Sequence, residues 1–482
     1  MGILSGLEPA KVFHYFEAIC GIPHGSYHTK QISDYCVRFA QEHGLHYIQD
    51  EANNVILFHP GTTGYEQSAP VILQGHLDMV CEKEPGCPMD FGKDGLHLRL
   101  EDGYVSADGT TLGGDDGIAV ACALAILDSD DIPHPPLEVI LTTDEEVGML
   151  GAAALDCSPL QSRIMLNLDS EDEGILLVSC AGGLQADCHI PVTRENADGL
   201  SVTVTLSGLT GGHSGVEIHK GRANANQLLG RFLNELGEAV RFRLCSVEGG
   251  LKDNAIPRKA AAALVIPPDE QAALTDAVSH WQAVFAGEYG VTDPALALTA
   301  EIGQAATVSA LDERSQRNVI AALVNVPAGV QRMSPDIPGL VQTSLNPGIL
   351  TTSEAEVTLV FSVRSSVRSE KEALYNRLEN LFTLLGGSVT RHGDYPAWEY
   401  RRDSRLRELM VQVFEQQYGH RPEVQAVHAG LECGLFAGKL PGLDCISFGP
   451  DMDDIHTTKE RLNVGSVRRT WNYLLEVLKQ LK

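Results

Sequence analysis

Four short segments interpreted as strand ends, and a fifth far along the chain, carry histidine or carboxylate side chains. These segments are residues 75–78, 113–117, 144–148, 167–170 and 454–457. Borderline divalent metals such as zinc take imidazole nitrogen and carboxylate oxygen as ligands, and catalytic sites keep one position for water or substrate. His76, His456 and several carboxylates would suit a pair of such ions. The sequence therefore indicates a metal centre assembled from distant parts of the chain.

Each segment alone also has a purely structural interpretation. A lone histidine is most often a satisfied core residue, but Asp78, two residues after His76, can lie on the same side and hold the second ring nitrogen. The GGDDG segment suits a plain turn, while its adjacent carboxylates and the lack of a following GK[ST] disfavour a phosphate cradle. Asp169 can cap a helix and His456 can lie in a loop. The occurrence of all these segments together favours a functional site.

The adjacent glutamates Glu145 and Glu146 give the most specific functional interpretation of these segments. They can be ordinary acids at a helix N-terminus, where the macrodipole favours them. Adjacent side chains point in different directions, however, so one glutamate can ligate a metal while the other faces the substrate as a general base. The pair is compatible with hydrolytic chemistry.

The elements that would position these segments follow an α/β pattern. Helical periodicity covers residues 11–20, 31–43 and 118–127, and apolar strand-like runs cover residues 55–58, 71–76, 137–143 and 164–169. Buried parallel strands with helical crossovers fit best. In such sheets a ligand crevice lies at the carboxyl ends of the strands, where the polar segments begin.

The pattern of apolar and polar residues changes after residue 182, and the new pattern predicts a large α+β insert. Residues 201–212 and 356–366 alternate at period two, and residues 222–240 and 369–385 show helical periodicity. The α/β pattern resumes with residues 403–418, 445–449 and 467–481, without a convincing short repeat anywhere. We therefore expect one domain, residues 1–182 and 396–482, interrupted by another, residues 183–395.

Composition narrows the class of protein. The chain has 482 residues and a formal net charge of −28, a field that repels nucleic acid and anionic membranes. Its 11 irregularly spaced cysteines are typical of reduced thiols. The sequence has no recognisable targeting segment and no apolar run approaching the ~20 residues that span a bilayer. We expect a soluble cytoplasmic protein with no nucleic-acid or membrane partner.

The motifs resemble those of the di-zinc exopeptidases, which include carnosinases, aminoacylases and glutamate carboxypeptidases. The matching motifs are GHLDMV, TLGGDDGIAVA, TTDEEVGMLGA, NLDSEDEG, GGHSGVEIHKGRANAN, and HAGLECG leading to DDIHTT. Within this group the chain is most similar to the bacterial aminoacyl-histidine (Xaa-His) dipeptidases, over essentially its whole length. The resemblance implies a zinc-exopeptidase-like catalytic domain, with a mixed sheet flanked by helices, interrupted by an α+β lid and dimerisation domain.

The resemblance also implies roles for individual residues. Two Zn²⁺ ions, for which Co²⁺ or Mn²⁺ can substitute, would be bound by His76, Asp115, Glu146, Asp169 and His456. Asp115 would bridge the ions, and we choose it over Asp116 because the family ligand precedes a second Asp or Asn, often across a cis peptide bond. Asp78 would orient His76, and Glu145 would be the general base.

In the insert, the resemblance implies residues that close over the substrate. His213 and, as a second candidate, His219 match a lid histidine that in relatives stabilises the oxyanion, often across a dimer. Asn254 and Arg364 match substrate-holding residues, and Arg364 suits a bidentate grip on a carboxylate. Considered without the resemblance, His213 can be a surface histidine in a tight turn. Asn254 can be a hydrogen-bonded loop asparagine, and Arg364 can be a surface arginine.

The function implied is hydrolysis of Xaa-His dipeptides, including β-alanyl-histidine, by a water that bridges the metals, with Glu145 as base. We expect a homodimer formed through the lid domain. An aminoacylase or another dipeptidase on the same site is the alternative within enzymes. A binding protein without turnover is disfavoured because Glu145 is retained beside Glu146.

Overall fold

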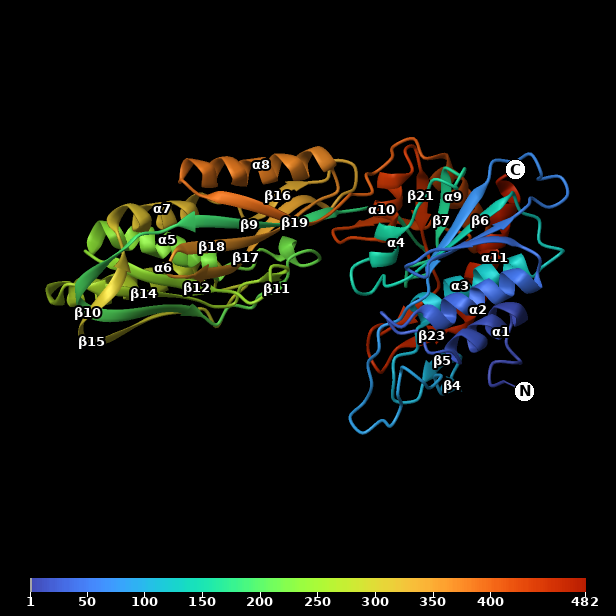
Figure 1. The fold of residues 1–482 in the computed structure, drawn as a ribbon, viewed down its shortest axis with the longest axis horizontal. Helices are drawn as coiled ribbons and strands as arrows, with labels where there is room; N and C mark the ends of the chain where they lie inside the picture. The colour runs from blue at the N-terminus through green and yellow to red at the C-terminus, as the bar shows by residue number, and fades with distance from the viewer. Residues whose placement is uncertain (1) are drawn as a thin grey trace. The chain divides into compact units, whose positions relative to one another are not determined.

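The computed structural model describes residues 2–482, which form two compact units (Figure 1). Unit 1 comprises the chain up to Cys180 together with Tyr400–Ala426 and Leu431–Lys482, and unit 2 comprises Ala181–Glu399 and Val427–Gly430. The sequence pattern carried no signal for the return of Val427–Gly430 to unit 2. The chain thus leaves unit 1 after Cys180 to build most of unit 2, and it contributes to unit 2 a second time with the short segment Val427–Gly430.

Unit 1 is built on an eight-stranded mixed sheet in the order β1-β2-β6-β3-β7-β21-β8-β20. Its elements before the interruption are α1 (Ala10–Cys20), α2 (Lys30–Glu42), β1 (His46–Gln49), β2 (Val55–His59), β3 (Val71–His76), β4 (Leu98–Glu101), β5 (Tyr104–Ala107), α3 (Gly114–Leu127), β6 (Leu137–Thr142), α4 (Leu150–Ala154), β7 (Ile164–Asn167) and β8 (Ile175–Cys180). Those after it are α9 (Arg405–Tyr418), β20 (Glu423–Val427), α10 (Glu432–Lys439), β21 (Asp444–Ser447), β22 (Met452–Asp453), β23 (Arg461–Asn463) and α11 (Val464–Gln480). The α/β class predicted from the sequence is confirmed.

The centre of this sheet explains why polar segments far apart in sequence meet. Strands β6, β3, β7 and β21 run parallel, and the outer pairs β1–β2, β2–β6 and β8–β21 run antiparallel. Every residue of β3 and β6 is buried, which is typical of parallel strands covered on both faces. The carboxyl ends of the four parallel strands therefore deliver their following residues to one edge.

Helix α3 brings a further segment to the same edge. All its residues are buried, and α1 packs against α3 while α3 packs against β3. Gly117 permits this approach because an added Cβ would lie 3.3 Å from the ring of Phe16. The element opens with a kinked turn in which Asp115 and Asp116 have non-helical backbone angles, and the regular helix follows close to residue 118, where the periodicity predicted its start.

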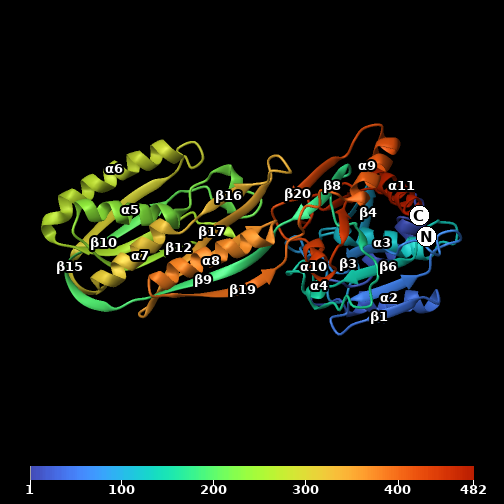
Figure 2. The same ribbon diagram turned by 90° about the horizontal axis from the view of Figure 1, so that it is seen from above.

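Unit 2 contains a nine-stranded sheet, one face of which is covered by helices α5 to α8 (Figures 1 and 2). Its elements are β9 (Gly182–Pro191), β10 (Arg194–Ser207), β11 (Gly212–His213), the 3₁₀ turn Ile218–Lys220, α5 (Ala225–Ala239), β12 (Arg243–Gly249), β13 (Ala255–Ile256), β14 (Ala260–Ile266), the 3₁₀ turn Pro268–Glu270, α6 (Gln271–Tyr289), β15 (Ala297–Leu311), α7 (Glu313–Asn325), β16 (Gly329–Met333), β17 (Val341–Thr352), β18 (Glu356–Ser365), α8 (Arg368–Leu384) and β19 (Ser388–Tyr395). The core between sheet and helices contains Phe232, Phe285, Phe361 and Phe382.

The topology of unit 2 repeats itself. Strands and helices β10-α5-β12-β14-α6-β15 form one half with sheet order β15-β10-β14-β12, and β9-α7-β17-β18-α8-β19 form the other with order β17-β18-β9-β19. Each half reads strand, helix, strand, strand, helix, strand. The first half is inserted between β9 and α7 of the second, and the two meet where β12 pairs with β17.

Candidate metal centre

His76 ends strand β3 and is almost completely buried. Its Nε2 lies 3.0 Å from Asp115 Oδ1 and 3.8 Å from Asp169 Oδ1. Its Nδ1 lies 3.0 Å from the main-chain oxygen of Asp78 and 3.6 Å from the carboxylate Oδ1 of the same residue. Asp78 thus contacts the second ring nitrogen mainly through its backbone, and Nε2 is directed at the carboxylates.

The Asp78 carboxylate also holds the adjacent glutamates. Its Oδ1 accepts a hydrogen bond from the Glu145 amide at 3.0 Å, its Oδ2 accepts one from the Glu146 amide at 3.4 Å, and Ser26 Oγ donates to Oδ2 at 2.8 Å. The preceding Asp144 has a φ of 53°, a left-handed conformation that few non-glycine residues adopt. Asp78 therefore fixes the turn after β6 as well as the imidazole, a role that the sequence did not suggest.

Asp115 presents its two carboxylate oxygens to different histidines. Oδ1 lies 3.0 Å from His76 Nε2, and Oδ2 lies 3.1 Å from His456 Nε2. Asp116, joined to Asp115 by a cis peptide bond, is fully buried and accepts a hydrogen bond from the His76 amide at Oδ2. The geometry therefore distinguishes the two aspartates, and only Asp115 reaches both imidazoles.

His456 and Glu146 complete the cluster. His456 Nε2 lies 2.9 Å from Glu146 Oε1, and the His456 backbone has a φ of 60°. The overlapping groups of possible metal ligands are His76 with Asp116 and Asp169, His76 with Glu145 and Glu146, and Asp115 with Glu146 and His456. Unit 1 thus brings together all five residues proposed as metal ligands from the sequence, and adds Asp116 and Glu145 as neighbours.

The electrostatics of this cluster fit bound cations. Burial, reinforced by neighbouring carboxylates such as Asp115, raises the pKa of Asp169 well above its usual range. Burial likewise raises the pKa of Glu145 to about 9, and hydrogen bonds to Asp115 and Glu146 raise the pKa of His456 to about 10. Carboxylates outnumber imidazoles here, so divalent cations would relieve their repulsion. The mixed oxygen and nitrogen donor set is one that zinc accepts.

In unit 2, the structure fixes the tautomer of His213. Its Nδ1 accepts hydrogen bonds from the amides of Gly215 at 3.2 Å and Val216 at 3.3 Å, so the neutral ring carries its proton on Nε2. Burial, with Arg364 nearby, lowers the pKa of His213. His213 is therefore a neutral hydrogen-bond donor at Nε2.

Arg364 lies on strand β18, opposite Ser344 of strand β17. Its Nη1 donates to the Tyr395 hydroxyl at 3.1 Å, and Nε is buried without an acceptor in the described chain. No carboxylate oxygen of residues 2–482 lies within 4.0 Å of its guanidinium. A half-buried arginine without a counter-ion is suited to an anionic ligand.

The other residues proposed for the lid are less enclosed. Asn254 is exposed, and its main-chain oxygen accepts a hydrogen bond from the Ser214 amide at 2.8 Å. His219 is also exposed and lines a cavity of about 370 Å³ with Arg222 and Tyr289. The sequence analysis gave no role to buried His428, whose Nε2 lies 2.7 Å from Ser344 Oγ, although it lies in the HAGLECG motif.

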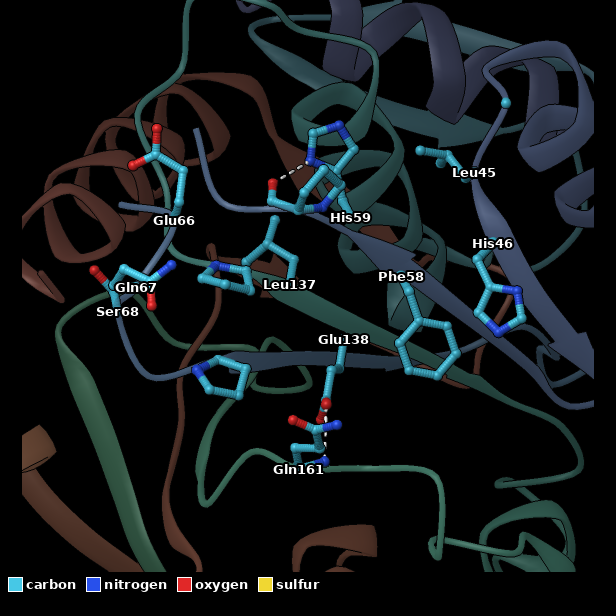
Figure 3. A pocket seen from close by; sticks show the side chains of 14 residues that line it. Leu45, His46, Phe58, His59, Glu66, Gln67, Ser68, Leu137, Glu138 and Gln161 are labelled. Atoms are coloured by element: carbon cyan, nitrogen blue, oxygen red, sulfur yellow. Dashed lines mark hydrogen bonds between the residues drawn. The ribbon is translucent and has the colours of Figure 1, made fainter. Parts of the chain in front are cut away.

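Two cavities in unit 1 differ in their relation to the cluster. One of about 960 Å³ is lined by Glu146 together with Met79, Met89 and Phe91. The other, of about 550 Å³, is lined by residues such as His46, Phe58 and Glu138 and by none of the proposed site residues (Figure 3). Only the first adjoins the candidate centre.

The comparisons with known proteins agree with this architecture. The family model of peptidase family M20/M25/M40 matches residues 72–480. The cytosol non-specific dipeptidase of Escherichia coli is 38% identical over 483 aligned residues, covering 100% of this chain and 99% of the relative. The chain is thus a peptide hydrolase by class. It belongs to peptidase family M20/M25/M40, and the resemblance inferred from the motifs is confirmed.

Solved structures show the same fold. The crystal structure of aminoacylhistidine dipeptidase from Vibrio alginolyticus superposes with a TM-score of 0.94 at 36% identity, covering 100% of this chain and 98% of that one. Aminopeptidase PepT from Bacillus cereus superposes with a TM-score of 0.57 at 15% identity, covering 98% and 99%, which shows the fold alone. Separately, no helix within residues 2–482 is both long and apolar enough to cross a membrane.

Proposed function

We propose that this chain is a di-zinc dipeptidase that hydrolyses Xaa-His dipeptides, including β-alanyl-histidine. The observation that carries the proposal is Asp115, whose two oxygens lie 3.0 Å and 3.1 Å from the Nε2 atoms of His76 and His456. A carboxylate held between two imidazoles is suited to bridge two cations. The name of the Vibrio relative supports the substrate class, and that of the Escherichia coli relative supports a dipeptide and a cytosolic location.

The residues that would hold the metals are His76, Asp115, Glu146, Asp169 and His456. When bound, two divalent ions would polarise the scissile carbonyl and lower the pKa of a water molecule. Asp78 keeps Nε2 of His76 directed at the cluster by engaging Nδ1, as supporting residues of metal sites commonly do. Replacement ions such as Co²⁺ or Mn²⁺ would meet the same donors.

Glu145 is the proposed general base. It is next to the proposed ligand Glu146, and one of its carboxylate oxygens lies within 4.8 Å of a ring nitrogen of His76. Its backbone amide donates a hydrogen bond to Asp78 Oδ1. The Glu145 carboxylate takes a proton from the attacking water and later delivers it to the leaving amine. Burial of Glu145 raises the affinity of this carboxylate for the proton that it must hold between the two steps.

Unit 2 supplies the groups proposed to hold the substrate. His213 Nε2–H would donate to the negative charge that develops on the carbonyl oxygen, and one such donor is typically worth about 3 to 4 kcal/mol of barrier. Arg364 would bind the terminal carboxylate, and Asn254 and His219 are proposed as further substrate-binding residues of unit 2. In unit 1, the cavity beside Glu146, with Met79, Met89 and Phe91, would take the N-terminal residue.

The proposal is tested by steady-state hydrolysis with chelated protein, with and without restored zinc. We expect zinc-dependent release of histidine from β-alanyl-histidine and other Xaa-His dipeptides. The name of the Escherichia coli relative favours a second candidate, a dipeptidase of broad specificity. Equal kcat/KM for dipeptides with and without a C-terminal histidine would favour that candidate. Hydrolysis of N-acyl amino acids alone would contradict both.

We also propose a homodimer formed through unit 2. Light scattering coupled to size exclusion is expected to give twice the mass of one chain. A mass equal to one chain at micromolar concentration would contradict the dimer and leave the proposed chemistry of unit 1 untouched.

A further inference from the structure

The loop before helix α3 surrounds a carboxylate from a distant part of unit 1. Glu460 Oε2 accepts hydrogen bonds from the amides of Leu112 at 2.7 Å and Gly113 at 3.2 Å. Glu460 Oε1 accepts from Gly114 at 2.8 Å and Asp115 at 3.5 Å. Four successive amides thus converge on one side chain, in the manner in which loops at helix N-termini bind phosphate.

The amides of residues 112–115 form a cradle around the Glu460 carboxylate, and this cradle depends on its glycines. Gly113 has a φ of 66°, a left-handed conformation that turns successive amides toward the same side. A Cβ on Gly114 would lie 3.3 Å from Glu460 Oε1 and 3.2 Å from Met452 Sδ. Glu460 itself is only 3% exposed, and no lysine, arginine or histidine of residues 2–482 forms an ion pair with it. The backbone amides are therefore what compensates this buried carboxylate.

Glu460 also belongs to the segment that carries His456. The Glu460 amide donates to the Thr457 main-chain oxygen at 3.1 Å, closing a turn directly after the histidine. Asp454 and His456 have φ values of 52° and 60°, so two non-glycine residues of this segment are left-handed. Such conformations persist only where the surroundings impose them. Glu460 anchors the segment at its C-terminal side.

We propose that Glu460 is a positioning residue that ties the Asp115 loop to the His456 segment. The Glu460 carboxylate holds the amides of the loop that ends at Asp115, and the Glu460 backbone belongs to the turn that directly follows His456. This sets the 3.1 Å approach of Asp115 Oδ2 to His456 Nε2 across residues far apart in sequence. The inference rests on the proposed metal centre and adds a residue that touches neither metal nor substrate.

The test compares Glu460→Gln with Glu138→Gln, a matched control. Glu138 is 5% exposed, and its carboxylate accepts a hydrogen bond from the amide of Gln161 at 2.8 Å (Figure 3). It also accepts one from the amide of Ser162 at 3.1 Å. It lies at the start of β6, the end of the strand opposite the candidate centre. Both variants lose a buried carboxylate that binds backbone amides, so both lower the urea midpoint.

Zinc affinity is measured by competition with a chromophoric chelator, and amide exchange of residues 112–115 by mass spectrometry. For Glu460→Gln we expect zinc affinity to fall by about 10- to 100-fold and exchange to increase. For Glu138→Gln we expect neither change. Unaltered zinc affinity in Glu460→Gln, or an equal loss in both variants, overturns the inference alone. Absence of zinc binding by the wild-type chain overturns the proposed function together with the inference.

Chemical rescue of zinc affinity in a Glu460→Ala variant provides a second test. Glu460→Ala empties the cradle, and added formate is expected to occupy it and restore part of the zinc affinity. The Glu138→Ala protein, treated in the same way, is expected to keep wild-type affinity with or without formate. No response of Glu460→Ala to formate, with the variant folded by circular dichroism, would contradict the claim that the carboxylate acts through these amides.

Discussion

At the scale of single residues, Glu145 and Glu146 occupy neighbouring positions with different expected roles. Glu146 lies 2.9 Å from His456 Nε2 in the proposed ligand cluster, whereas Glu145 is proposed to move a proton. Glu145→Gln is therefore expected to bind zinc like the wild type and to lower kcat by about 10²- to 10⁴-fold. Glu146→Gln, the matched variant, is expected to lose metal. Bound metal is quantified by atomic emission beside steady-state kinetics.

Zinc content and turnover together distinguish a general-base role of Glu145 from a metal-ligand role. Normal turnover by a zinc-loaded Glu145→Gln protein would show that Glu145 is not the base. Loss of zinc from Glu145→Gln would instead place Glu145 among the ligands, in agreement with its grouping with His76 and Glu146.

Buried His428 makes unit 2 sensitive to acid. Burial, together with the charge of Arg364, lowers its pKa to about 3, whereas a histidine in an unfolded chain titrates near 6.5. Between these values the unfolded chain binds a proton that the folded chain excludes, so stability falls as pH falls from about 6.5 towards 3. At pH 5 this residue is expected to reduce the stability of unit 2 by about 2 kcal/mol relative to pH 7.5.

The measurement is the urea midpoint of unit 2 at pH 7.5 and pH 5.0, followed by the fluorescence of Trp281 and Trp398. His428→Gln keeps an amide for Ser344 and lacks the titrating ring, so its midpoint is expected to change less between the two pH values than that of the wild type. His280→Gln, at an exposed position of the same unit, is expected to behave like the wild type. Parallel shifts in all three proteins would contradict the assignment.

Residue types predicted that His76, His456 and several carboxylates form one metal site, and the resemblance to the di-zinc exopeptidases singled out Asp115 among them. They did not reveal Glu460. A single glutamate four residues after a histidine looks like any surface acid until the loop at residues 112–115 folds around it.

At the scale of elements, the cap of helix α11 is an accessible test of unit 1. Asn463 Oδ1 accepts a hydrogen bond from the Ser466 amide at 2.8 Å. Asn463→Ala removes that acceptor and is expected to cost about 1 kcal/mol, which lowers the melting temperature by roughly 2 to 4 °C. Asn463→Asp keeps a capping oxygen and is expected to melt within 1 °C of the wild type. A larger loss in the aspartate variant than in the alanine variant would exclude capping as the cause.

Strands of unit 1 were predictable because buried parallel strands read as uninterrupted apolar runs, as in Val71–His76 and Leu137–Thr142. The small sheet of β22, β23, β5 and β4 was not predicted, since its strands are only two to four residues long. In unit 2, β15 and α6 were missed because β15 is largely exposed and α6 buries only Leu274 and Phe285.

At the scale of the whole molecule, metal removal is expected to affect the two units unequally. All proposed donors lie in unit 1, so chelation removes binding energy from that unit only. A metal present at about a thousand times its Kd contributes about 4 kcal/mol, equivalent to a shift on the order of 10 °C. We expect chelation to lower one calorimetric transition and leave the other unchanged, with Trp471 reporting the first and Trp281 the second. Equal shifts of both transitions would contradict this assignment.

The two halves of unit 2 share a topology without a recognisable repeat in the sequence. Period-two and helical patterns specify which face of an element is buried, and many sequences satisfy the same pattern. The sequence therefore predicted an α+β insert and could not predict that it contains the same arrangement twice. Nor could it predict that β9 is separated from its neighbours β18 and β19 by the entire first half.

The interruption of unit 1 also has a consequence in time. His76 and His456 are separated by 380 positions, with all of unit 2 between them. At a synthesis rate of about 5 to 20 residues per second, a ribosome would need roughly 20 to 80 s to pass from the first histidine to the second. During that interval the nascent chain would hold His76, Asp115, Glu146 and Asp169 without their last partner. Peptide hydrolysis would therefore begin only after His456 has been synthesised and has joined the site, and the incomplete chain on the ribosome would not hydrolyse peptides.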